Sequence, residues 1–172
     1  MAGPRILVEG VGGIGGVVAG QMLRAGQDLT LVTGNADIAR AIAERGLRVK
    51  TRDGAYSVPA RAVATVEALA QEPPFDLALL IMKATRVVEA ARVTVPLLAS
   101  EGYLVTCQNG IVEDAVASIV GAERVVSAIV GWGGTMHGPG DVERTGPGAI
   151  HLGELDGRRS ERVLALQRLL EP

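Results

Sequence analysis

Short aliphatic runs alternate along the chain with longer segments whose apolar residues recur at helical spacing. Each short run predicts a strand, and each longer segment predicts a helix. In chain order, the predicted strands and helices are 5–8, 14–25, 29–32, 37–45, a short helix from Thr65 to Ala70, 77–81, 86–98, 103–106, 112–120, 125–130 and 160–170. Because strands that alternate with helices build βαβ units, the pattern predicts the α/β class: a Rossmann-type, doubly wound, mainly parallel sheet with helices on both faces.

Two predicted hairpins interrupt this alternation. Residues 47–50 and 56–60 flank an Asp-Gly dipeptide, which is typical of tight turns between antiparallel strands. Nearer the end of the chain, residues 141–144 are expected to pair with residues 149–152. The stretch 133–140 reads as the loosest part of the chain and is a candidate boundary. The strand signals after it nevertheless favour one domain over residues 1–172.

The composition narrows the class of protein. Hydrophobic residues make up 48% of the chain and charged residues 21%, as in ordinary globular domains. A net charge of −2, with one Trp, two Tyr and one Phe, gives no indication of a nucleic-acid partner. The longest apolar run, 77–82, is far shorter than the ~18 residues of a membrane helix. The single cysteine, Cys107, excludes an intrachain disulfide and favours a reducing, cytoplasmic location.

The strongest local signal lies where the first predicted strand meets the first helix. The residues there match the pattern G-x-G-x-x-G and are Gly10, Val11, Gly12, Gly13, Ile14 and Gly15. In this context Gly10 permits a tight turn, Gly12 lets the backbone approach a pyrophosphate, and Gly15 lets the helix pack close to the strand. The helix N-terminus adds unpaired N–H groups and a partial positive charge. A glycine-rich turn that only packs tightly is the alternative interpretation.

Two neighbouring features bear on which dinucleotide binds. Glu9 precedes the motif, and a carboxylate repels a pyrophosphate, so Glu9 is expected either to point away or to weaken the site. At the end of the second strand an Asp or Glu would indicate NAD and an Arg would indicate NADP. This chain has Thr33, Gly34 and Asn35 there, with Arg40 further along. Thr33 and Asn35 can bind a phosphate or a hydroxyl, although Asn35 is equally well explained as a helix N-cap.

Two polar residues follow later strands at the edge where ligands bind in parallel sheets. Lys83 follows the apolar run 77–82, and Asn109 follows the strand at 103–106. Each is a candidate for positioning a substrate or cofactor, and neither is assigned as a catalytic residue. The alternatives are a solvated lysine and an ordinary Asn-Gly turn. The two histidines, His137 and His151, have no carboxylate at the spacing of a catalytic triad or metal site, so no metal is expected.

The order of these signals resembles the ketopantoate reductase (2-dehydropantoate 2-reductase) family, specifically its N-terminal NAD(P)-binding domain. Segments 44–49, 127–140 and 148–153 also look like parts of that domain. The resemblance implies reduction of a 2-oxo acid, 2-dehydropantoate or a similar compound, to a 2-hydroxy acid in pantothenate biosynthesis. It implies NADP as the cofactor. NAD stays open because the arginine usual in the family after the second strand is replaced here.

The resemblance also assigns roles by position. Gly10 to Gly15 would bind the pyrophosphate, Lys83 would contact the cofactor and help position the substrate, and Asn109 would bridge the two. Gly134 falls near a small residue that lies along the cofactor in the family. Thr33 and Asn35 complete the expected cofactor-binding set.

Family members carry a second, all-helical domain with the catalytic lysine and a substrate-binding glutamate, and this chain resembles only the first domain. The chain alone is therefore expected to be inactive. One alternative function is a non-catalytic dinucleotide-binding sensor or partner module. Another is part of an enzyme similar to the 3-hydroxyacid dehydrogenases. An exposed apolar patch on the last helix is also expected, as a docking or homo-oligomer surface, formed by Val163, Leu164, Leu166, Leu169 and Leu170.

Overall fold

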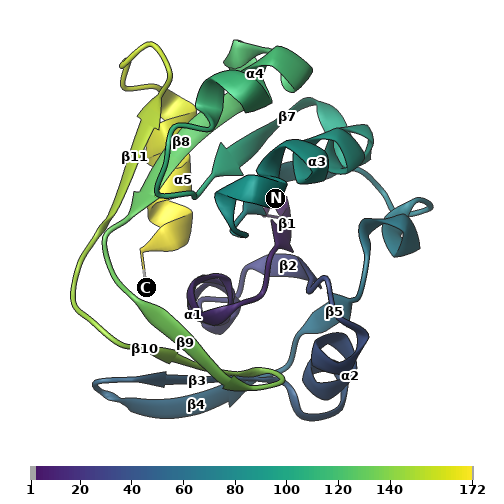
Figure 1. The fold of residues 1–172 in the computed structure, drawn as a ribbon, viewed down its shortest axis with the longest axis vertical. Helices are drawn as coiled ribbons and strands as arrows, with labels where there is room; N and C mark the ends of the chain where they lie inside the picture. The colour runs from purple at the N-terminus through teal and green to yellow at the C-terminus, as the bar shows by residue number, and fades with distance from the viewer. Residues whose placement is uncertain (1–2, 172) are drawn as a thin grey trace.

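A large, mostly parallel sheet forms the centre of the computed structural model, which describes residues 3–171. Its strands are Arg5–Glu9 (β1), Asp28–Val32 (β2), Arg61–Val63 (β5), Phe75–Leu80 (β6), Leu98–Thr106 (β7), Val125–Val130 (β8) and Ile150–Glu154 (β11). Within the described residues these seven strands lie in the order β11-β8-β7-β6-β1-β2-β5 (Figure 1). Neighbouring strands are parallel, except that β11 runs antiparallel to β8. The predicted Rossmann-type α/β class is confirmed.

Helices cover both faces of this sheet and confirm most of the predicted helical segments. The α-helices are Gly13–Arg24 (α1), Ala36–Arg45 (α2), Ala84–Thr94 (α3), Glu113–Val120 (α4) and Glu161–Leu170 (α5). Buried residues of α1, α2 and α5 share one hydrophobic core, and those of α3 and α4 belong to the core on the other face. Short 3-10 helices occupy Val66–Leu69, Val95–Leu97 and Ala122–Arg124.

Two helical predictions need correction. The segment predicted over residues 86–98 ends its α-helix at Thr94 and continues as a 3-10 turn, because Pro96 cannot donate the next helical hydrogen bond. The short helix predicted from Thr65 is a four-residue 3-10 helix, and the Thr65 side chain makes no capping hydrogen bond to it.

The direction in which strands are added reverses at the centre of the sheet. From β1 the chain adds β2 and then β5 on one side, and it returns to add β6, β7 and β8 in turn on the other. Ligands of open parallel sheets bind outside the carboxyl ends of the strands at such a switch point. The fold therefore directs attention to the carboxyl ends of β1 and β6.

A second, smaller sheet lies across α1. It consists of Leu47–Thr51 (β3), Gly54–Val58 (β4), Gly134–Gly138 (β9) and Asp141–Arg144 (β10), in the order β4-β3-β10-β9. Figure 1 shows α1 enclosed between the two sheets. The contact is close: a Cβ on Gly20 would lie 2.3 Å from Val49 Cγ2, and one on Gly16 would lie 2.7 Å from Val142 Cγ1. Glycines on this side of α1 therefore allow the second sheet to pack against the helix.

The pairing of the late strands differs from the prediction. The first predicted hairpin is confirmed, since β3 and β4 pair antiparallel. The second is wrong: β10 pairs with β9 and β3, whereas β11 pairs with β8 of the large sheet. The stretch 133–140 accordingly holds the strand β9 and the turn after it. Its alternating residues pack against α1 and β10. The glycine-rich composition is the reason that no strand was predicted there.

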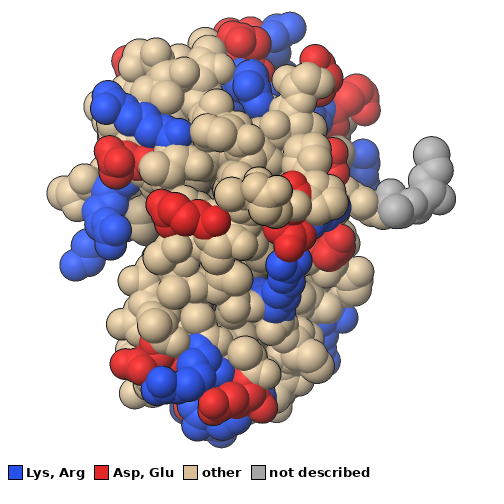
Figure 2. All heavy atoms as spheres, turned by 90° about the vertical axis from the view of Figure 1, so that its right-hand side faces the viewer, with Lys and Arg blue, Asp and Glu red and all other residues tan. Residues whose placement is uncertain are grey.

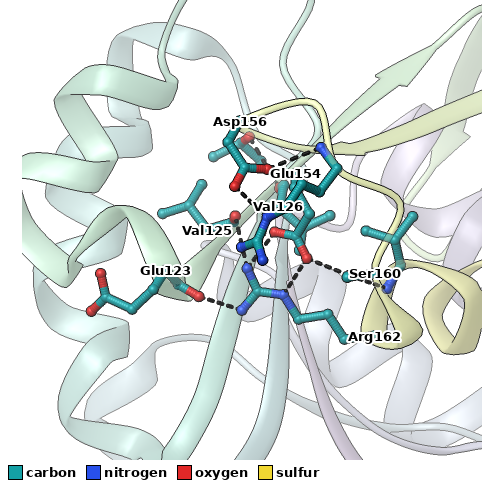
Figure 3. A network of polar contacts seen from close by, with 10 residues as sticks. Glu123, Val125, Val126, Glu154, Asp156, Ser160 and Arg162 are labelled. Atoms are coloured by element: carbon teal, nitrogen blue, oxygen red, sulfur yellow. Dashed lines mark hydrogen bonds and ion pairs between the residues drawn. The ribbon is translucent and has the colours of Figure 1, made fainter.

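Helix α5 is fixed to the large sheet by an ion pair (Figure 3). Arg162 Nε donates to Glu154 Oε1 of β11 at 2.7 Å, and the Glu154 side chain is only 6% exposed. The same arginine donates to the carbonyl oxygens of Glu123 and Val125, next to and within β8. The Ser160 hydroxyl donates to Glu154 and also caps α5 by accepting from the Val163 N–H.

The apolar face of α5 is turned inward, which corrects the predicted exposed patch. Val163 and Leu166 are buried in the core, and Leu169 and Leu170 pack partly buried against it. Among residues 3–171, the exposed large hydrophobic side chains are instead Ile111 and Ile129. Over the same residues, no helix has the length and apolar character needed to cross a bilayer.

Candidate functional site

The glycine loop between β1 and α1 forms a tight turn at the centre of the sheet edge. Gly10 has φ +101°, a conformation that side chains strongly disfavour, and its N–H donates to Val32 O of β2 at 2.9 Å. A Cβ on Gly10 would lie 2.6 Å from the Ile81 carbonyl oxygen. The loop is therefore wedged between the ends of β2 and β6, and its backbone path requires glycine.

The next two motif glycines have different surroundings. A Cβ on Gly15 would lie 2.0 Å from the Gly10 carbonyl oxygen, so this position has room for hydrogen alone. A Cβ on Gly12 would meet nothing within 4 Å, and Gly12 has an ordinary φ of −88°. The backbone at Gly12 thus faces open space, which is the space that a pyrophosphate would need.

The first turn of α1 also suits an anion. Its N-cap is Gly12, no side chain caps it, and its first turn holds no acidic residue. The first N–H groups of a helix have no partner inside the helix, and its N-terminus carries a partial positive charge. The uncapped N–H donors at the start of α1 therefore adjoin the open space at Gly12.

Glu9 points away from this open space. Its Oε2 accepts a hydrogen bond of 2.6 Å from the Thr94 hydroxyl of α3, on the face of the sheet opposite to α1. Burial raises the pKa of Glu9 above 4.5, while the Thr94 hydrogen bond and the charge of Arg86 act in the opposite direction. Of the two expectations for Glu9, the structure shows the first.

The strands bring the other predicted residues to the same edge. Asn109 follows β7, Lys83 follows β6, Gly10 follows β1 and Thr33 follows β2, and these four strands are neighbours in the sheet. Lys83 is exposed and has no ion pair among residues 3–171. Asn109 is exposed as well, and its Nδ2 makes a long contact of 3.5 Å with Val130 O. Both side chains are therefore available to a ligand.

At the end of β2 the polar side chains are largely engaged within the loop. The Thr33 hydroxyl donates to Asn35 O at 2.6 Å, and Asn35 Oδ1 caps α2 by accepting from the N–H groups of Asp37 and Ile38. Arg40 lies 2.7 Å from Asp37 Oδ1 in an exposed ion pair. The N-cap interpretation of Asn35 is confirmed.

Gly134 lies beside the glycine loop because the two backbone segments are in contact. A Cβ on Gly13 would lie 2.3 Å from the Gly134 carbonyl oxygen, and one on Gly134 would lie 2.6 Å from the Gly13 carbonyl carbon. The start of β9 and the first turn of α1 are thus in backbone contact. This placement sets the second sheet directly beside the loop.

Gln108 is a residue that the sequence analysis did not single out. It is 4% exposed, and its Nε2 donates to Leu80 O at 2.8 Å and to Met82 O at 3.1 Å. It therefore joins the turn that carries Asn109 to the turn that carries Lys83, while its Oε1 is buried without a partner. The sequence does show an amide side chain directly after a strand. The carbonyl groups to which this buried amide donates lie more than twenty residues away, so the sequence does not reveal its role.

Other polar groups do not join this edge. His137 pairs with Glu143 of β10 at 2.6 Å, and His151 lies on β11. Burial raises the pKa of Cys107 to about 12, so its thiol is inert at neutral pH. No group of three or more His, Cys, Asp or Glu side chains suited to a metal ion occurs among the described residues.

Two surface cavities lie along the second half of α1. The larger, of about 1230 Å³, is lined by Arg24, Lys50 and Tyr56 among others. The other, of about 640 Å³, is lined by Trp132 and other residues, and Gln21 contributes to both. At ~1.5 Å per helical residue, Gln21 is about 12 Å from the start of α1. Neither cavity coincides with the glycine loop, which lies on an open edge of the sheet.

Several known sequences similar to this chain are named as reductases. The sequence profile described as "Ketopantoate reductase PanE/ApbA" matches residues 6–157. A 2-dehydropantoate 2-reductase of Mesorhizobium japonicum is 31% identical, covering 94% of this chain and 55% of the relative. One of Halobacterium salinarum is 29% identical, covering 94% and 53%. The chain thus spans about half the length of these relatives.

Solved structures agree with the sequence comparisons. The 2-dehydropantoate 2-reductase of Geobacter metallireducens is 28% identical with a TM-score of 0.86, covering 96% of this chain and 54% of that one. A D-mandelate dehydrogenase, solved with NADH and anilino(oxo)acetate, is 25% identical with a TM-score of 0.81, covering 96% and 52%. By the profile match, the sequence relatives and the fold, this chain belongs to the ketopantoate reductase family of oxidoreductases.

Proposed function

We propose that this chain is the dinucleotide-binding part of an enzyme that reduces a 2-oxo acid, 2-dehydropantoate or a similar compound, to a 2-hydroxy acid. The family and the dehydrogenase neighbours support a nicotinamide dinucleotide as the cofactor. The names of the relatives support the substrate class, since mandelate is a 2-hydroxy acid. The chain covers about half of each relative, so the complete activity is part of the proposal.

The observation that carries the proposal is the fit of the glycine loop to a diphosphate. Gly12 faces open space, and the first turn of α1 has neither a side-chain cap nor an acidic residue. Glu9, the one carboxylate adjoining the loop in sequence, bonds to Thr94 instead. Together these features leave backbone donors free for an anion at the switch point of the sheet.

The reacting end of the cofactor is assigned to the neighbouring strands. When bound, a reduced nicotinamide supplies a hydride to a carbonyl carbon. Lys83 offers a positive charge to a phosphate or to a substrate carboxylate, and the Asn109 amide can donate and accept hydrogen bonds at the same edge. Gln108 keeps the turns that carry these two side chains together. We place the general acid in the part of the relatives that this chain does not cover.

Titration with NADH and NADPH tests the proposal, with nicotinamide fluorescence as the signal. Saturable binding that ADP-ribose displaces is expected, because ADP-ribose retains the diphosphate. No turnover of 2-dehydropantoate above the background rate is expected, since the loss of general acid catalysis alone costs ~10²–10⁴-fold. Absence of binding to both cofactors would refute the proposed function. Measurable turnover would refute the assignment of the general acid elsewhere.

A further inference from the structure

The ribose that distinguishes NAD from NADP would lie at the end of β2, if the proposed function holds. The Gly10 N–H bonds to the last residue of β2, so the loop after this strand adjoins the glycine loop. NADP carries a phosphate on the 2′-oxygen of this ribose, where NAD carries a hydroxyl. The groups available in the segment 33–40 therefore decide which cofactor is accepted.

Three donors that could bind a phosphate are already engaged in this segment. The N–H groups of Asp37 and Ile38, at the start of α2, donate to Asn35 Oδ1. The Thr33 hydroxyl donates its single hydrogen to Asn35 O at 2.6 Å. Unlike α1, helix α2 thus begins with a side-chain cap, and two of its first amides are not free for an anion.

The carboxylate in the first turn of α2 also opposes a phosphate. Asp37 places a carboxylate in the first turn of α2, and its Oδ1 holds Arg40 at 2.7 Å. The ion pair has no net charge. Because both side chains are about two-thirds exposed, the second carboxylate oxygen of Asp37 stays accessible. A carboxylate oxygen accepts hydrogen bonds from a ribose diol, whereas it repels a phosphate that carries a charge of about −2.

The surroundings add further negative charge. Glu67 follows β5, the strand that neighbours β2 on the side away from β1. At the bottom of Figure 2, where α2 lies, acidic and basic side chains are interspersed. Arg40, the cation nearest the start of α2, is paired with Asp37.

We propose that Asp37, held by Arg40 and supported by the Asn35 cap, makes this chain select NADH over NADPH. This is opposite to the cofactor that the family resemblance implies. The Asp37 carboxylate accepts from the ribose hydroxyls and excludes the 2′-phosphate, and Arg40 is the cation that the phosphate would otherwise recruit.

Fluorescence titration of the same chain with NADH and NADPH tests the selection. NADH is expected to bind at least ~10-fold more tightly than NADPH at low ionic strength. The ratio should fall as salt is added, because the groups involved are exposed and screened. Equal affinities, or tighter binding of NADPH, would overturn the inference while leaving the proposed function intact. Binding of neither cofactor would refute both.

An Asp37→Asn variant assigns the effect to this residue. Removing the charge frees Arg40, so NADPH affinity should rise ~5- to 10-fold and NADH affinity should fall or stay within ~2-fold. Glu161→Gln removes an exposed carboxylate from the first turn of α5 and serves as the matched control, with both affinities unchanged. Thermal unfolding of each variant separates loss of helix stability from altered recognition. An unchanged NADH-to-NADPH ratio in the Asp37 variant would overturn the assignment.

Discussion

Glu9 of β1 and Thr94 of α3 are 85 residues apart in sequence, and their side chains are joined by a hydrogen bond of 2.6 Å. The bond holds the carboxylate on the face of the sheet opposite to α1. A negative charge next to a diphosphate-binding loop would oppose binding, so this contact removes an objection that the sequence raises. It also makes Glu9 a partly buried acid whose ionisation bears on stability.

The pH dependence of the unfolding free energy should reveal the ionisation of Glu9. The pKa of Glu9 is raised above 4.5 in the folded chain, mainly by burial. The folded state therefore holds the proton more tightly than the unfolded state, and stability is lost as pH rises from about 4.5 through the folded pKa. Glu9→Gln keeps an acceptor for Thr94 but cannot ionise. Its stability relative to wild type should rise across that window, by on the order of 1 kcal/mol.

Urea unfolding at a series of pH values from 4 to 8 measures this difference. Glu44→Gln, an exposed position on α2, is a suitable control and should show no such trend. A difference between Glu9→Gln and wild type that stays constant, or falls, with rising pH would show that the Glu9 carboxylate is not held as described.

Alanine variants of Gly12 and Gly15 should separate an effect on cofactor affinity from an effect on the unfolding free energy. A Cβ at Gly12 enters open space, so Gly12→Ala should change the unfolding free energy by less than about 1 kcal/mol while cofactor affinity falls ~10-fold or more. A Cβ at Gly15 would lie 2.0 Å from the Gly10 carbonyl oxygen, so Gly15→Ala should destabilise the chain by about 1–3 kcal/mol or more.

Chemical unfolding and fluorescence titration together test this pair of variants. Gly138→Ala is the control, because a Cβ there also meets nothing within 4 Å and the residue lies at the far end of β9. Full cofactor affinity in Gly12→Ala would indicate that the loop serves packing alone, which is the alternative that the sequence left open.

Gln108 should contribute to stability through the two carbonyl groups that it satisfies. Gln108→Leu leaves Leu80 O and Met82 O without this donor, which should cost about 1–3 kcal/mol. Cofactor affinity should fall too, because the turns bearing Lys83 and Asn109 lose their connection. Gln167→Leu, at an exposed position on α5, provides the comparison in urea unfolding. Equal stability of the two variants would mean that the buried amide is dispensable.

The Arg162–Glu154 ion pair should be a main anchor of α5. Removing the arginine leaves an almost fully buried carboxylate, so Arg162→Leu should destabilise the fold by about 3–5 kcal/mol at pH 7. Arg168→Leu, exposed on the same helix, should stay within about 0.5 kcal/mol of wild type. The hydrogen bond from Arg162 lowers the pKa of Glu154 below 4.5. The contribution is therefore complete above about pH 4.5 and is lost as pH falls through the lowered pKa, so the gap between Arg162→Leu and wild type should narrow in acid.

Local patterns in the sequence were sufficient for most strands of the large sheet, for its α-helices and for the glycine loop, whereas β5 was not predicted and β11 was paired with the wrong strand. Apolar spacing identifies which segments are strands or helices, and Gly10 and Gly15 are required by close backbone contacts within a few residues or at the adjacent strand. Asn35 was recognisable as a cap because capping is a local interaction.

Long-range pairing was not accessible in the same way. The two-residue period of a strand tells which face a residue occupies and does not identify the partner, so 141–144 was paired with the wrong segment. The strand at Gly134–Gly138 was hidden by its glycines, of which Gly134 is needed for contact with α1. The roles of Gln108 and Thr94 depend on partners that only the folded chain brings near.

Amide chemical shifts of the ¹⁵N-labelled chain during titration with NADH test the central claim most directly. If the uncapped start of α1 holds the diphosphate, the largest shifts should occur at the N–H groups of Val11 to Ile14, and in Gly12→Ala they should require ~10-fold or more NADH. Shifts confined to the cavities along the second half of α1, or no shifts at saturating NADH, would contradict the account.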